Sequence, residues 1–136
     1  MASHSDLNIL VVDDDIFIRK TVEERLNTEG YRVTTAEDGK AGWEKLLENT
    51  YQLIITDINM PNINGIELLY RVLATKIKVP AVVMSGELNK AMETLIKTTG
   101  ANAFLRKPFS AKELLDAVKS SLKREDDEDS FHYYTN

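Results

Sequence analysis

Short apolar runs alternate with longer amphipathic segments along most of the chain. The apolar runs predict strands at residues 8–12, 32–36, 53–56, 81–85 and 103–106. Strands that alternate with helical segments of ten or so residues are typical of repeated βα units and of a parallel sheet that is covered on both faces. The first, third and fourth runs contain almost only Val, Ile, Leu and Met, so we expect those three strands at the centre of the sheet.

The segments between these strands carry helix signals. The spacing of apolar residues predicts five helices, at 17–29, 40–48, from Gly65 until before Pro80, 89–99, and from Ser110 onward. Gly30 suits the left-handed position that often ends a helix. Ser110 and Glu113 form an S-x-x-E capping box, which makes the fifth helix the clearest.

The fourth predicted helix places four apolar residues on one side. These residues are Leu88, Met92, Leu95 and Ile96.

Length and composition indicate one domain. A chain of 136 residues with 43% hydrophobic and 29% charged residues suits a single globular unit, which we place at 7–123 with a tail at 124–136. No run approaches the roughly 20 apolar residues of a membrane span, and the first residues lack the basic start of a signal peptide. We therefore expect a cytoplasmic protein that does not bind membranes. The absence of cysteine excludes disulfides and agrees with a reducing compartment.

The net charge of -5 is unevenly distributed. Five consecutive acids occupy residues 125–129, and the preceding 124 residues hold equal numbers of acids and bases. A protein that binds nucleic acid through charge needs a basic face, so we expect no direct nucleic-acid partner. His4 and His132 lie in the end segments, where we predict no role for them. The aromatic residues at 131–134 fit either a docking tail or a segment without a role.

Polar residues follow four of the five predicted strands. In an open parallel sheet the site lies beyond the carboxyl ends of the strands, so these side chains are expected at one rim. They are Asp13, Asp14, Asp57, Ser85 and Lys107.

Three acids in one crevice repel one another unless a cation lies between them. Hard oxygen ligands with few protein contacts suit Mg²⁺ better than zinc, and Mg²⁺ commonly completes its shell with phosphate oxygens. Asp57, at the end of a central strand, can act as a nucleophile and form an aspartyl phosphate. Lys107 would neutralise charge on the phosphoryl oxygens, and Ser85 could donate a hydrogen bond to one of them, unless it only caps the next helix.

The motifs "ILVVDDD", "LIITDINMPNINGIEL", "VVMSG" and "AFLRKPF", in this order and spacing, resemble the receiver domain of bacterial two-component response regulators. The similarity covers about residues 7–123 and is of the single-domain, chemotaxis-regulator-like kind. It implies a flavodoxin-like (βα)5 fold, with a five-stranded parallel sheet in the order 2-1-3-4-5 and helices on both faces.

The resemblance also implies residue roles. Asp57 becomes the phosphoacceptor, and Asp13 and Asp14 hold Mg²⁺, or Mn²⁺ in its place, with Asp57 and the backbone carbonyl of Asn59. Ser85 and Lys107 contact the phosphoryl group. The remaining implied roles belong to Phe104, an aromatic switch that moves inward on activation, and to Glu87 and Asn59, which tune hydrolysis of the acyl phosphate.

The resemblance implies two further features near the site. Many relatives have Tyr where this chain has Phe104, so any switch here depends on packing without a hydroxyl. The Lys107–Pro108 peptide is expected to be cis. Asp15 we interpret as a residue at the start of a helix, not as a metal ligand.

The function implied is a signalling switch, not an enzyme that acts on other substrates. A histidine kinase or phosphotransfer protein would donate its phosphoryl group to Asp57, and the domain would assist its own phosphorylation and dephosphorylation. A downstream protein is expected on the face formed by the fourth helix, the fifth strand and the fifth helix. We expect a stand-alone regulator or a phosphorelay intermediate, with a piece of a longer protein as the alternative.

Three other functions fit the sequence less well. A phosphatase with an aspartate nucleophile needs D-x-D after the first strand and a cap domain, and a flavodoxin needs a Ser-, Thr- and Gly-rich phosphate loop where this chain has three acids. An interaction module that is never phosphorylated stays open, although such relatives tend to lack one of the pocket residues and this chain has them all.

Overall fold

A computed structural model describes residues 6–123 and 131–134. Strands and helices alternate along the described chain, which matches the alternation in the sequence. Their bounds are β1 Asn8–Val12, α1 Ile16–Thr28, β2 Arg32–Ala36, α2 Gly39–Glu48, β3 Leu53–Asp57, α3 Gly65–Leu73, β4 Ala81–Ser85, α4 Lys90–Thr98, β5 Ala103–Arg106, α5 Ala111–Leu122 and β6 His132–Tyr134.

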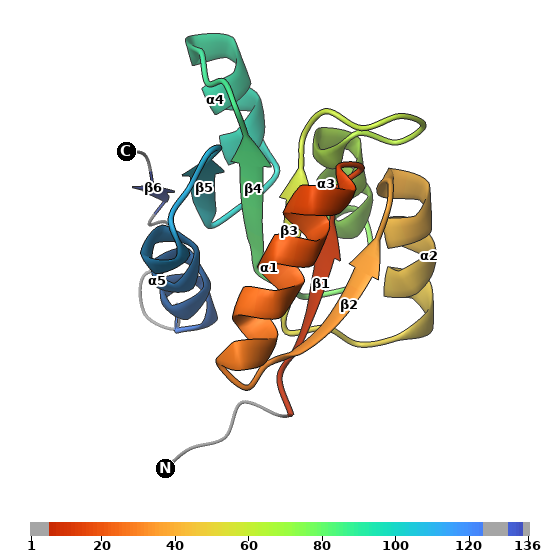
Figure 1. Ribbon diagram of the computed structural model, residues 1–136. Coiled ribbons are helices and arrows are strands. Elements are labelled where there is room, and N and C mark those ends of the chain that lie inside the picture. The colour runs from red at the N-terminus through yellow and green to blue at the C-terminus, as the bar shows by residue number, and fades with distance from the viewer. Residues whose placement is uncertain (1–5, 124–130, 135–136) are drawn as a thin grey trace.

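The strands form one parallel sheet in the order β2-β1-β3-β4-β5-β6. The three strands that we expected at the centre do lie together, and β2 is an edge strand (Figure 1). The expected order 2-1-3-4-5 is correct as far as it goes, but the prediction of a five-stranded sheet is wrong. A sixth strand pairs with β5 in the parallel direction. Parallel neighbours need a long connection, and α5 lies in the connection between these two strands.

Helices cover both faces of the sheet (Figure 1). Buried residues of α1 and α5 pack with Ile9, Val11 and Leu53 on one face. On the other face α2, α3 and α4 pack with Leu10 and Ile54. The two faces use alternate residues of each central strand, so β3 and β4 are buried along their whole length.

Local signals fix where several helices begin and end. Asp15 is the N-cap of α1 and accepts hydrogen bonds from the backbone N–H groups of Phe17 and Ile18, which confirms its interpretation as a residue at a helix start. Ser110 and Glu113 form the predicted capping box of α5. Gly30, just past α1, has a φ of 95°, as a left-handed helix end requires.

The apolar side of α4 is only partly buried. Ile96 is fully buried, and Leu88 and Met92 pack against the same core, but Leu95 is 48% exposed. Ile96 is the buried residue within the nine residues of α4, so the core covers only part of the apolar side of this helix.

The predicted tail is described only in part. The acidic run at 125–129 and His4 lie outside the described residues, so the predictions about them stay predictions. Within the described residues, none of the helices has the length and hydropathy needed to cross a membrane.

Candidate functional site

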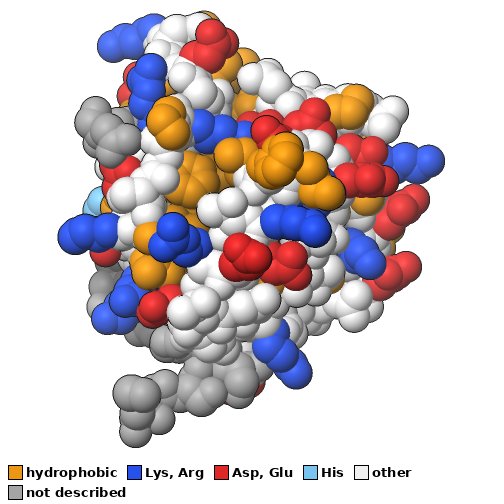
Figure 2. Space-filling view, in the orientation of Figure 1, with side chains coloured by type: hydrophobic (Ala, Val, Ile, Leu, Met, Phe, Trp, Pro, Cys, Tyr) orange, Lys and Arg blue, Asp and Glu red, His pale blue; other side chains and the backbone are white. Residues whose placement is uncertain are grey.

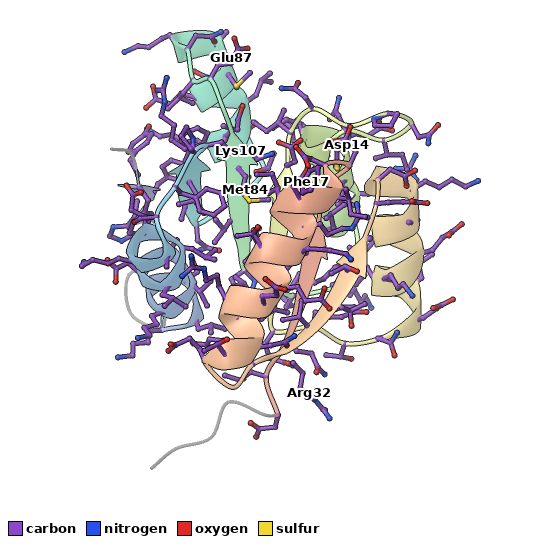
Figure 3. All side chains as sticks on the ribbon, viewed as in Figure 1. Asp14, Phe17, Arg32, Met84, Glu87 and Lys107 are labelled. Carbon is purple, nitrogen blue, oxygen red and sulfur yellow. The ribbon has the colours of Figure 1, made fainter. Side chains whose placement is uncertain are left out.

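Acidic side chains gather where β1 and β3 end. Val12 of β1 is paired with Thr56 of β3, so the residues that follow them, Asp13 and Asp57, lie side by side. Asp14 completes a group in which one carboxylate oxygen from each residue lies within 4.8 Å of the others. Figure 3 shows Asp14 at this end of the sheet, with Lys107 facing the same region from the neighbouring strands. The convergence predicted from the strand ends is therefore present.

Lys107 bridges two of the three acids. Its Nζ lies 2.8 Å from Oδ2 of Asp13 and 3.2 Å from Oδ1 of Asp57. The Asp13 side chain is 0% exposed and the Asp57 side chain 9%, so the ion pairs are largely shielded from water. Backbone geometry brings the lysine there, because the N–H of Lys107 donates to the carbonyl of Ser85 at the end of β4.

Asp13 is held by contacts on every side. Its Oδ1 accepts the backbone N–H of Asp15 at 2.9 Å, and its carbonyl accepts a hydrogen bond from the Arg19 guanidinium at 2.7 Å. Its own N–H donates to the carbonyl of Ala36 on β2. Asp14, by contrast, is exposed. The first acid is thus structurally fixed, while the second is open to solvent and to a ligand.

The loop after Asp57 is closed by a tight packing contact. The N–H of Gly65 donates to the carbonyl of Ile58, and a Cβ added to Gly65 would lie 2.1 Å from the carbonyl oxygen of Asp57. Only glycine allows so close an approach. Gly65 therefore holds α3 against the strand end that presents Asp57.

The surroundings change the pKa values of Asp57 and Lys107. Burial is the largest influence on Asp57 and raises its pKa above the usual range; the charge of Asp13 acts in the same direction and Lys107 opposes both. For Lys107, burial alone would lower the pKa, but the hydrogen bond to Asp13 and the charges of Asp13 and Asp57 outweigh it, so the pKa is raised. The single positive charge of Lys107 thus lies beside two carboxylates, those of Asp13 and Asp57.

The chemistry of this group fits a divalent cation. Carboxylate oxygens are the ligands preferred by Mg²⁺, and one carboxylate oxygen each from Asp13, Asp14 and Asp57 lies within 4.8 Å of the others. Within residues 6–123 and 131–134, the acidic group that could hold a metal consists of the three predicted acids. Asn59 is exposed in the loop two residues after Asp57, and coordination through its carbonyl stays a prediction.

Ser85 and Glu87 lie at the end of β4. The Ser85 side chain is fully buried, and its Oγ accepts the backbone N–H of Glu87 at 3.2 Å. It does not cap α4, since Asn89 is the N-cap of that helix. Glu87 is exposed in the turn that leads into α4 (Figure 3). The alternative role of Ser85 as a helix cap is therefore wrong.

Phe104 lies on β5, beside Val83 of β4, and is fully buried. Tyr133 of β6 packs against its ring edge to face, with the centroids 6.4 Å apart. The Lys107–Pro108 peptide is cis, as expected.

Sequence reasoning missed several supporting residues. Gly65 lies within the motif "LIITDINMPNINGIEL", but nothing in that motif indicates how closely its backbone approaches Asp57, and Arg19 belongs to none of the quoted motifs. Tyr133 gave only a weak signal, an aromatic residue in a short segment after a run of acids.

Comparison with known proteins assigns the family. The model of the response regulator receiver domain matches residues 9–119. The chain belongs to the response regulator receiver family. Response regulator ArlR of Staphylococcus epidermidis is 34% identical over 122 residues, which cover 90% of this chain and 55% of that protein. The receiver domain described here spans about half the length of the curated relatives that it matches.

Solved structures of receiver domains share the fold. Chemotaxis response regulator CheY4 of Vibrio cholerae is 31% identical with a TM-score of 0.81, over 86% of this chain and 99% of that one. A CheY-like receiver domain protein from Methanospirillum hungatei is 29% identical with a TM-score of 0.82, over 87% of this chain and 94% of that one. The flavodoxin-like architecture is therefore that of a two-component receiver domain.

Proposed function

We propose that this receiver domain is a phosphorylation switch in which Asp57 accepts a phosphoryl group from a phosphohistidine donor. The observation that carries the proposal is the bridge from Lys107 to Asp57 and Asp13, with Asp14 open beside it. This arrangement presents one carboxylate nucleophile, one ammonium group and spare carboxylate oxygens at the same place.

Transfer requires that an Asp57 carboxylate oxygen forms a bond to phosphorus as the bond from phosphorus to the donor's imidazole nitrogen breaks. Asp57 reacts as the carboxylate, and Lys107 favours that form although burial opposes it. The ammonium of Lys107 can then donate hydrogen bonds to the phosphoryl oxygens. Buried groups of fixed geometry are effective here, because phosphoryl transfer depends mostly on positioning and electrostatics.

Asp13, Asp14 and Asp57 would hold Mg²⁺, with Mn²⁺ as an alternative ion and the Asn59 carbonyl as a further ligand. The ion, when bound, would neutralise charge on the transferred group and on the acids around it. Asn59 and Glu87, both exposed beside the strand ends, would control how readily water reaches the acyl phosphate and so the lifetime of the signal.

Output is proposed to pass through Ser85 and Phe104 to the α4–β5–α5 face. Both side chains lie on the same face of the sheet, because Phe104 of β5 is paired with Val83 of β4, two residues before Ser85. A phosphoryl group at Asp57 would draw the Ser85 hydroxyl toward it, and the space released would be taken up by Phe104. A downstream protein would recognise the changed face.

The donor is proposed to be a histidine kinase or phosphotransfer protein that docks at the start of α1. Phe17 is 80% exposed and Ile16 48%, directly after Asp14 and the cap residue. Figure 2 shows apolar atoms with acidic side chains beside them on this face, and Figure 3 labels Phe17 next to the site. Large exposed apolar side chains bordered by charge are typical of protein contacts.

The domain would act on no other substrate and would only assist its own phosphorylation and dephosphorylation. We further propose that it works as a stand-alone regulator or phosphorelay intermediate in the cytoplasm, with protein contacts and no nucleic acid as its output. The chain matches nearly all of CheY4, which supports the proposal, but it matches only about half of ArlR.

Intact-mass measurement after incubation with acetyl phosphate tests the function. With Mg²⁺ present the parent protein should gain about 80 Da, the mass of one phosphoryl group, and Asp57→Asn should gain none. Asp116→Asn, which changes an exposed aspartate of α5 (46% exposed side chain), is the matched control and should label like the parent. A parent that gains no mass, and binds no beryllofluoride, would instead be an interaction module without phosphorylation.

A further inference from the structure

The last described segment of the chain occupies the outer edge of β5. Residues 131–134 place β6 parallel to β5, with Phe104 opposite Tyr133 and Leu105 opposite Tyr134. The N–H of His132 donates to the carbonyl of Asn102, which starts the pairing. Figure 1 shows β6 outside β5, on the side away from β4.

Side chains of the segment contact both flanking helices. The hydroxyl of Tyr133 donates a hydrogen bond to Glu93 of α4, and the hydroxyl of Tyr134 lies 2.7 Å from the Ser120 hydroxyl of α5. Lys97 of α4 lies 5.7 Å from the ring centre of Phe131 and 5.8 Å from that of Tyr133. The segment therefore covers α4, β5 and α5 together.

These contacts are specific, yet the segment is not part of the deep core. Its strand is only three residues long, and Tyr133 is 40% exposed. The segment contacts the ion pair between Lys97 and Glu93, whose side chains are 49% and 27% exposed. A short edge strand with half-exposed side chains is the kind of element that opens locally without unfolding the protein.

One contact links the segment to the site. Tyr133 packs on Phe104, the fully buried aromatic three residues before Lys107. Lys107 in turn contacts Asp57. If Phe104 moves toward Ser85, Tyr133 loses the ring on which it rests.

We propose that residues 131–134 are a detachable strand that occupies the α4–β5–α5 face while Asp57 is unmodified and leaves it when Asp57 carries a phosphoryl group. This inference rests on the proposed function and adds its regulation. The occupant is the chain's own segment, and a protein partner of this face can bind only after the segment has left. Because the two events are coupled, loss of the docked strand must in turn favour the phosphorylated state.

Amide hydrogen exchange of the full chain, with and without beryllofluoride and Mg²⁺, tests the proposal. Beryllofluoride should make exchange at 131–134 faster by about tenfold or more and lower the protection of β5, as local opening requires. Exchange in the loop at 57–65 should become slower, since the anion binds there. Slower exchange at 57–65 with no change at 131–134 would overturn the detachable strand alone, while no change at either segment would overturn the proposed function as well.

A second experiment tests the coupling in the other direction. The variant Phe131→Ser with Tyr133→Ser should bind beryllofluoride about threefold more tightly or better, because the docked state no longer competes. Tyr70→Ser is the control, since Tyr70 of α3 is 38% exposed, nearly as much as Tyr133. A purely structural strand would leave the affinity of the double variant equal to that of the control. That equality would overturn the proposal, and so would a double variant that forms dimers through the bared β5 edge and binds the anion no better.

Discussion

The carboxylate form of Asp57 is less favourable in the metal-free folded protein than in the unfolded chain. Burial and Asp13 raise its pKa, and Lys107 only partly offsets them. An acid with a raised pKa binds its proton more tightly in the folded state than in the unfolded state. Stability therefore falls as the pH rises from the ordinary value of 3.8 through the raised pKa.

Asp57→Asn should accordingly raise the free energy of unfolding by about 1 kcal/mol near pH 7 in the presence of a chelator. The gain should shrink as the pH falls toward the ordinary carboxyl range, where the parent is protonated too. Urea unfolding of parent and variant measures this difference at pH 7 and again near the ordinary carboxyl pKa of 3.8, with Asp116→Asn as control. If Asp57→Asn is less stable than the parent at pH 7, the attraction of Lys107 for the Asp57 carboxylate outweighs the effects of burial and of Asp13.

Asp13 and Asp14 are adjacent in sequence, but their substitution should change the stability of the protein by different amounts. Asp13 is fully buried and pairs with Lys107, so Asp13→Ala should lower the free energy of unfolding of the metal-free protein by about 2–4 kcal/mol. Asp14 is exposed, so Asp14→Ala should change it by less than about 0.5 kcal/mol.

Both substitutions should weaken Mg²⁺ binding in titration calorimetry. The comparison separates a metal ligand from a structural residue, because only Asp13 should affect stability without the ion. A marked loss of metal-free stability in Asp14→Ala would contradict this explanation of the triple aspartate.

At the scale of elements, the junction of β3 and α3 depends on one glycine. A Cβ at position 65 would lie 2.1 Å from the Asp57 carbonyl oxygen, whereas a Cβ on Gly86 would meet nothing within 4 Å. Gly65→Ala should thus cost about 2–4 kcal/mol of stability and disturb Asp57, while Gly86→Ala should change stability by less than about 0.5 kcal/mol. Thermal unfolding of the two variants checks this prediction, and equal melting temperatures would show that the loop adapts freely.

Much of this arrangement could be predicted because parallel strands impose it. Once the strands at 8–12 and 53–56 are adjacent and parallel, the acids that follow them must meet, whatever the loops do. The cap role of Asp15 was predictable for a similar local reason. The closure of the loop by Gly65 was not, because it depends on a backbone approach that no local pattern reports.

The sixth strand shows a different limit. Three residues are too few for an alternating pattern that would predict a strand. The segment is a strand because it pairs with β5 and its aromatic side chains contact α4 and α5. The exposure of Leu95 has the same origin, since the sheet decides which side of α4 is covered. Short elements are thus fixed by tertiary contacts, not by their own sequence.

At the scale of the molecule, docking of the donor can be separated from the chemistry. Phe17 is exposed beside the site and contributes no ligand, so Phe17→Ala should slow transfer from a phosphohistidine protein by about tenfold. Labelling by acetyl phosphate, which is too small to need a docking surface, should be unchanged. Parallel rate measurements with the two donors test this, and equal slowing with both would place the defect in the site itself.

The most direct test of the account is to locate the phosphoryl group. Borohydride reduces an aspartyl phosphate to homoserine, which peptide sequencing by mass spectrometry identifies by position. We predict homoserine at position 57 after incubation with acetyl phosphate and Mg²⁺, and none when the ion is chelated. Homoserine at position 13 or 14, or labelling that persists without the ion, would contradict a site in which a divalent cation and Lys107 prepare Asp57 alone.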